Sequence, residues 1–169
     1  MTDAPATPNQ PQQPQLTILR QYVKDLSFEN PGAPDTLRAG AAAPAIDLSF
    51  DVQARSVQPD VYEVMLNVEA RATREDNVIF IVELAYAGLF QMTGFADPER
   101  EAMLLIECPR LIFPYARKVL ADTTQEGGFP PLMLDPVDFA GLYRQQLAKR
   151  QAAAQGQEPN GTADPSTAN

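Results

Sequence analysis

The sequence predicts an α+β domain in which a four-stranded antiparallel Greek-key sheet carries helices on one face. Three observations lead to this fold class. Residues 22–90 contain four segments with the two-residue period of strands, and short turns at 58–60 and 74–77 separate the last three. The period becomes helical from about residue 97, so strands and helices are segregated along the chain. A length of 169 residues, 44% of them hydrophobic, fits one domain around one core.

Both ends of the chain are predicted to be tails. Residues 1–15 are rich in proline and have no large apolar side chain after Met1, and residues 151–169 consist mainly of small and polar residues. Neither segment can bury enough apolar surface to offset the entropy of ordering it. We therefore expect a disordered tail at 1–15, a folded domain at 16–150 and a second disordered tail at 151–169.

The first strand ends at Glu29, where Pro31 and Pro34 stop it. Its alternation from Tyr22 onwards assigns residues to two sides. One side holds Tyr22, Leu26 and Phe28. The opposite side holds Val23, Asp25, Ser27 and Glu29.

The other three strands form a predicted meander. Segments 46–55 and 62–71 alternate apolar with polar residues, whereas 78–90 is apolar on both sides except for Glu83. An apolar strand of this kind is typical of the centre of a sheet. The connection over residues 30–44 is long and rich in proline, so it cannot be a tight hairpin. We expect it to cross over, so that the first strand pairs beside the fourth in Greek-key order.

Three helices are predicted in the second half. The first spans 97 to about 107 and ends at Pro109, and the second runs from Pro114 to residue 126 and is stopped by Gly127-Gly128. The third opens at Asp135-Pro136. Its apolar face would carry Phe139, Leu142, Tyr143 and Leu147.

Composition limits the classes of function. The net charge of −9 and the sequence pI near 4.4 argue against direct binding to nucleic acid or to anionic membranes and favour basic partners. The N-terminus lacks the basic and apolar segments of a signal peptide, and no apolar run is long enough to span a membrane. These features predict a cytoplasmic protein without membrane insertion.

Catalytic chemistry finds little support in the residues. The chain has no histidine and no glycine-rich phosphate loop, and Asp47 and Asp51 are better explained as a solvated sheet surface than as a catalytic pair. Cys108 lies among apolar neighbours and without a metal-ligand pattern, which favours a buried structural thiol over a reactive one. We therefore expect no enzyme, no catalytic residues, no cofactor and no metal site.

Two surfaces are candidates for binding. If the first and fourth strands pair, Asp25, Glu29 and Glu83 converge around Ile81, which makes either an acidic docking surface or an ordinary solvated sheet face. Glu63 and Glu69 are expected on the same side. The apolar run at 129–134 lies in a loop, so it either plugs the core or lines a groove.

Three blocks of sequence resemble the SecB family of bacterial chaperones, which deliver unfolded preproteins to the export motor. They are ILRQYVKDLSFENPGAP at 18–34, LIFPYARKVL at 111–120 and GGFPPLMLDPVDFAGLY at 127–143. The resemblance covers about 18–146. It implies an ATP-independent cytoplasmic chaperone that holds preproteins in an unfolded, translocation-competent state. It also implies a homotetramer built as a dimer of dimers.

The resemblance further implies two sets of site residues. The basic, zinc-bearing C-terminal tail of the motor SecA would dock on Asp25, Glu29, Ile81 and Glu83, and the zinc would belong to SecA. The groove for unfolded clients would be lined by Phe28, Tyr115, Phe129, Met133 and Phe139. Relatives often carry an aromatic residue in the crossover, where this chain offers Leu37.

Two other interpretations stay open. One is a SecB-like chaperone dedicated to a single client, such as the antitoxin of a toxin–antitoxin pair. The other, from a different class, is a small-molecule-binding or enzymatic α+β protein, which would bind a defined ligand and would not bind unfolded chains.

Overall fold

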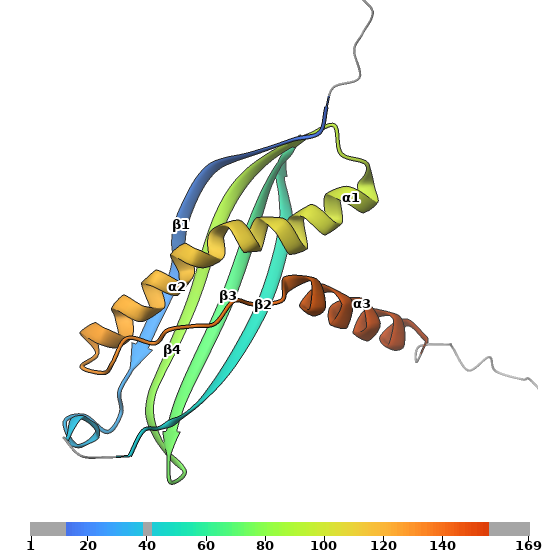
Figure 1. The fold of residues 1–169 in the computed structure, drawn as a ribbon. Coiled ribbons are helices and arrows are strands. Elements are labelled where there is room, and N and C mark those ends of the chain that lie inside the picture. The colour runs from blue at the N-terminus through green and yellow to red at the C-terminus, as the bar shows by residue number, and fades with distance from the viewer. Residues whose placement is uncertain (1–12, 39–41, 156–169) are drawn as a thin grey trace, which may run out of the picture.

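The computed structural model describes residues 13–38 and 42–155, and within them the strands form one antiparallel sheet in the order β1-β4-β3-β2 (Figure 1). The strands are β1 (Gln15–Glu29), β2 (Ala45–Gln58), β3 (Val61–Arg74) and β4 (Asn77–Thr93). The predicted pairing of the first strand with the fourth is confirmed, and the two-sided apolar strand β4 lies in the middle of the sheet.

Two tight turns join β2 to β3 and β3 to β4. The first consists of Pro59 and Asp60, and the second of Glu75 and Asp76. Asp60, Glu75 and Asp76 have φ angles of 59°, 47° and 65°. The positive φ angles of both Glu75 and Asp76 give the second hairpin a twist that matches its strands. The crossover from β1 to β2 contains the short 3₁₀-helix η1 (Asp35–Leu37).

One continuous helical run crosses the sheet, made of α1 (Asp97–Ala102), the π-helical turn η2 (Met103–Glu107) and α2 (Cys108–Glu126) (Figure 1). The predicted break between Pro109 and Pro114 is therefore wrong. The Cys108 N–H donates to the Met103 carbonyl five residues back, so a wider turn precedes Pro109 and makes room for its ring.

Pro114 lies inside α2 rather than at the start of a helix. Its neighbours Ile112, Phe113 and Ala116 are buried against the sheet. Burial of an apolar helix face outweighs the hydrogen bond that an internal proline removes. Sequence reasoning gave the proline the greater weight and so divided the helix.

The end of α2 agrees with the prediction, with Gly127 after the last turn and Gly128 at a φ of +88°. The next segment runs back across the sheet to α3 (Phe139–Gln155) near β2 (Figure 1). This helix begins later than the predicted Asp135-Pro136, because Asp138 caps it by accepting a 2.9 Å hydrogen bond from the Gly141 N–H. It continues through Gln155, into the segment expected to be a tail.

The core lies between α2 and one face of the sheet, here called the helix face. Phe90 on β4 is fully buried there, as are Ile112 and Leu120 on α2. Cys108 is also buried, as predicted, and burial raises the pKa of its thiol to about 12. Within 13–38 and 42–155, no helix combines the length and apolar character needed to cross a membrane.

Candidate functional site

The opposite face of the sheet, here called the polar face, brings together the acidic residues that the sequence singled out. Glu29 on β1 lies opposite Ile81 on β4, and Ser27 lies opposite Glu83. The Ser27 hydroxyl donates a 3.2 Å hydrogen bond to the Glu83 carboxylate. Asp25 lies in the next row of the same face, opposite Ala85. We call Asp25, Glu29, Ile81 and Glu83 the acidic patch.

Carboxylates on the neighbouring strands extend the acidic patch. Glu69 on β3 lies directly opposite Glu83, and Asp51 on β2 accepts a 3.3 Å hydrogen bond from the Asn67 amide. A shallow hollow of about 480 Å³ separates these groups. Its four acidic lining residues are Asp25, Asp51, Glu69 and Glu83. Among the described residues that line it there is no lysine or arginine, so the hollow can receive a cationic group.

Sequence reasoning missed the contribution of Asp51, which it treated as part of a solvated surface. The strand register was the missing information. Asp51 pairs with Asn67, which pairs with Ala85, which pairs with Asp25. One row of paired residues therefore carries acids from both edge strands to the same hollow.

A β-bulge at Lys24 changes the two sides of β1. The register shifts between Val23 and Asp25, so that Tyr22 lies on the polar face, opposite Ala87. The prediction that Tyr22 shares a side with Leu26 and Phe28 is therefore wrong. An unpaired extra residue reverses which residues of the strand point to which face. No local pattern in the sequence indicates where such a residue lies.

Glu63 on β3 is on the predicted face but is not an exposed acid, because only 4% of it is exposed. Its carboxylate accepts hydrogen bonds from Arg55 Nε at 2.5 Å, from Lys24 Nζ at 2.9 Å and from the Tyr22 hydroxyl. The bonds from Arg55 and Tyr22 lower the pKa of Glu63 to about 2, against the opposing effect of burial. Burial and the bond to Glu63 raise the pKa of Tyr22 to about 12.

A second hollow, of about 510 Å³, opens where the crossover meets the segment after α2. Large apolar side chains from the crossover, β2, β4 and the segment after α2 line it. They are Leu37, Ile46, Phe80, Phe129, Leu132 and Met133. Met133 is 68% exposed and Leu37 is 44% exposed. We call this hollow the apolar groove. Leu37 thus occupies the crossover side of the groove, where relatives often carry an aromatic residue.

An aromatic cluster forms one wall of the apolar groove. The Phe129 ring lies 4.9 Å from the Phe80 ring and 6.4 Å from the Phe28 ring, between centroids. Phe28 also packs against the end of α2, where a Cβ added to Gly127 would come within 2.2 Å of its ring. Glycine is therefore required at position 127 for this packing.

Two of the five residues predicted for the client groove line it, Phe129 and Met133. Phe28 packs against the Phe80 and Phe129 rings from outside the lining. Tyr115 on α2 is 53% exposed but does not line the apolar groove. Phe139 is buried in the core, 1% exposed, with its ring 5.8 Å from that of Phe113. The assignment of Phe139 to the groove is therefore wrong, because its side chain packs the start of α3 against α2.

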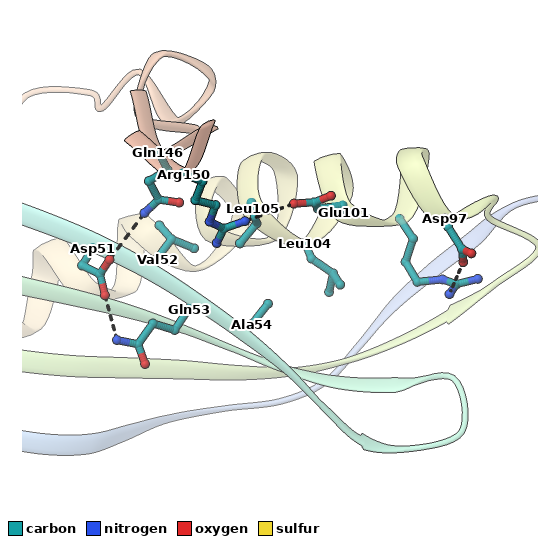
Figure 2. A pocket seen from close by; sticks show the side chains of 11 residues that line it. Asp51, Val52, Gln53, Ala54, Asp97, Glu101, Leu104, Leu105, Gln146 and Arg150 are labelled. Atoms are coloured by element: carbon teal, nitrogen blue, oxygen red, sulfur yellow. Dashed lines mark hydrogen bonds and ion pairs between the residues drawn. The ribbon is translucent and has the colours of Figure 1, made fainter. Parts of the chain in front are cut away.

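A third hollow, of about 620 Å³, lies between β2, α1 and α3 (Figure 2). Its charged groups pair with one another, Arg100 with Asp97 at 2.8 Å and Arg150 with Glu101 at 3.5 Å. Gln146 on α3 also donates to Asp51, at 3.4 Å. These contacts attach α3 to the body of the domain and are explained without a ligand.

Comparisons with known proteins agree with the resemblance seen in the sequence. A family model described as preprotein translocase subunit SecB matches residues 9–150. The protein-export protein SecB of Maricaulis maris is 66% identical over the whole of both chains. That of Caulobacter vibrioides is 53% identical over 85% of each chain.

A solved structure has a similar fold at lower identity. The SecB-like chaperone of Mycobacterium tuberculosis, in complex with a peptide from an antitoxin, aligns with a TM-score of 0.61 at 20% identity. The alignment covers 72% of this chain and 90% of that one. Since the family model spans most of the chain and a full-length relative is 66% identical, the chain belongs to the SecB family of protein-export proteins.

Proposed function

We propose that the protein is a cytoplasmic chaperone that holds preproteins unfolded without ATP and hands them to the motor SecA for export. The observation that carries this proposal is the apolar groove. Leu37 and Met133 expose apolar side chains beside the aromatic wall of Phe80 and Phe129, which Phe28 supports from outside the groove. An unfolded chain, unlike a folded one, offers apolar side chains that can reach into such a groove.

The character of the groove suits a binder of many sequences. Met133 is unbranched and largely exposed, so it can adapt to different client side chains. Burying one large apolar client side chain is worth about 1.5–3 kcal/mol before the cost of ordering the client. A groove that takes only a few such anchors binds a short segment weakly, so tight binding needs one client to occupy several grooves at once.

Self-assembly into a homotetramer would supply those several grooves. Support comes from β1, an edge strand whose exposed apolar residues are Ile18, Leu19, Val23 and Leu26. A long edge with this composition is prone to uncontrolled pairing unless another chain covers it. A second copy of β1 is the occupant we propose, with two such dimers forming the tetramer.

The acidic patch is the proposed docking surface for the basic, zinc-bearing C-terminal tail of SecA. Its support is the convergence of Asp25, Glu29 and Glu83 on one face, with Ile81 as an apolar contact among them. Complementary charge mainly speeds the encounter and selects the partner. Delivery then follows from one protein binding both the client and the motor.

The test of the chaperone function is suppression of aggregation. A denatured precursor diluted into buffer should stay soluble when an equimolar amount of this protein is present and nucleotide is absent. Aggregation at the rate seen without the protein would overturn the proposal. Capture from a cell lysate then separates a general export chaperone from one dedicated to a single antitoxin: the former retains many envelope precursors, the latter one dominant client.

A further inference from the structure

The buried carboxylate of Glu63 is not explained by the groove or by the acidic patch, yet it joins three strands. Its donors Tyr22 and Lys24 come from β1, and its third donor Arg55 comes from β2. We propose that Glu63 is a positioning residue for the acidic patch. It holds Lys24 and Arg55 away from the docking carboxylates and fixes the bulge that sets the face of Asp25. This inference rests on the proposed docking of a basic partner.

The route of the contact is unusual, because β4 lies between β1 and β3. Tyr22 lies opposite Ala87 on β4, and the Tyr22 hydroxyl bonds Glu63 on the strand beyond. The small side chain of Ala87 leaves the space that the Tyr22 ring needs to cross. Lys24, at the bulge itself, reaches the same carboxylate. Two anchors on one acceptor fix the conformation of the bulge.

The bulge determines what Asp25 presents. In an uninterrupted strand, Tyr22 and Asp25 would point to opposite faces, because their separation is odd. With the extra residue at Lys24, both lie on the polar face. Loss of the bulge would leave either Tyr22 or Asp25 on the wrong face. The bonds of Tyr22 and Lys24 to Glu63 therefore help to keep Asp25 in the row that contains Asn67 and Asp51.

The charges of the two cations matter as well. Lys24 precedes Asp25 in the chain, and Arg55 lies two residues beyond Gln53, whose amide donates to Asp51 at 2.8 Å. Released from Glu63, both cations would border the acidic hollow. They would then compete with a basic partner for the same carboxylates. With a pKa lowered to about 2, Glu63 stays ionised and keeps both cations paired at neutral pH.

The test measures binding of the zinc-loaded C-terminal tail of SecA to the full-length protein. Glu63→Gln should weaken binding about three- to tenfold, the range expected when freed surface cations occupy exposed carboxylates. Glu99→Gln, on α1, is the matched control with the same change in net charge, and it should bind like the wild type. Tyr22→Phe removes one donor and leaves the carboxylate charged. It is the variant to measure in place of Glu63→Gln if Glu63→Gln does not fold.

Rescue separates a positioning role from a merely structural one. Adding Lys24→Gln and Arg55→Gln to Glu63→Gln removes the competing cations and should restore most of the lost affinity. A general loss of structure would not be restored in this way. Amide hydrogen exchange at residues 22–25 should be faster in Glu63→Gln than in the wild type, both with and without the SecA tail.

Two results would overturn the inference: wild-type affinity together with wild-type exchange in Glu63→Gln, or weakened affinity that the added substitutions do not restore. A charge-reversal variant of the acidic patch distinguishes failure of this inference from failure of the docking proposal. It combines Asp25→Lys, Glu29→Lys and Glu83→Lys. If that triple variant binds like the wild type, the docking surface is wrong. Hydrogen exchange then still decides whether Glu63 fixes the bulge.

Discussion

Glu69 and Glu83 are paired directly across β3 and β4, so two carboxylates of like charge face each other on the polar face of the sheet. Like charges in this position destabilise a sheet. Glu69→Gln should therefore raise the free energy of unfolding by about 0.5 kcal/mol at low ionic strength, and the gain should shrink as salt screens the pair. Denaturant titrations at two salt concentrations measure this. A variant less stable than the wild type at low salt would contradict it.

Reversing the charge of the acidic patch should abolish motor docking. Asp25 and Glu83 are exposed, as is Glu29, so their replacement by lysine should leave the fold intact. Titration calorimetry with the SecA tail should show no binding by the triple variant, and wild-type binding should weaken as salt rises, because charges are screened beyond about 8–10 Å at physiological ionic strength. Unchanged affinity in the triple variant would mean that the patch is only a solvated surface.

Met133 and Phe129 separate the two interpretations of the apolar segment after α2. Met133 is 68% exposed, so Met133→Ser should weaken the binding of a denatured precursor and leave the melting temperature unchanged. Phe129 packs on Phe80 at 4.9 Å between ring centroids. Phe129→Ser should therefore lower the free energy of unfolding by about 2–4 kcal/mol. Equal losses of stability in both variants would show that the segment only plugs the core.

Acid should reveal the contribution of Glu63 to stability. Its pKa is lowered from 4.5 to about 2 in the folded protein, so its stabilising effect is complete above about pH 4.5 and is lost as the pH falls towards 2. The contribution is on the order of 3 kcal/mol. Denaturant unfolding between pH 6 and pH 2 should show a flatter profile for Glu63→Gln than for the wild type. Parallel profiles would contradict the assignment.

The proposed assembly predicts a solution mass of four times 18.5 kDa. Light scattering at micromolar concentration measures it directly. Val23→Lys and Leu26→Lys place charges on the exposed apolar side chains of the β1 edge and should yield smaller species. Leu48→Lys, on the exposed part of β2, is the matched control and should keep the wild-type mass. A wild-type monomer would remove the basis for binding one client in several grooves.

The strand order could be predicted from the sequence because its signals are local and strong. The turns at 58–60 and 74–77 are short, and the 30–44 connection excludes a hairpin. Together with the central position of β4, these connections determine which strands pair with each other. The convergence of Asp25, Glu29 and Glu83 then follows from simple alternation, because the bulge at Lys24 lies before all three.

The errors arose where tertiary packing overrides a local signal. Pro109 and Pro114 are tolerated in one helical run because a π turn precedes the first and buried neighbours surround the second. Phe139 belongs to the core because Asp138 starts α3 at that point and turns its ring onto Phe113. Glu63 seemed to be a surface acid because the side chains that cover it come from other strands.

Phe28 and Glu29 are neighbours in the chain, yet Phe28 packs against Phe129 of the apolar groove and Glu29 belongs to the acidic patch. The two proposed sites are thus separated by the thickness of a single strand. A client in the groove and a basic tail on the patch would not compete for space, so both can be held at once. Transfer to the motor would then proceed through a ternary complex, in which the client need not be released before the motor arrives.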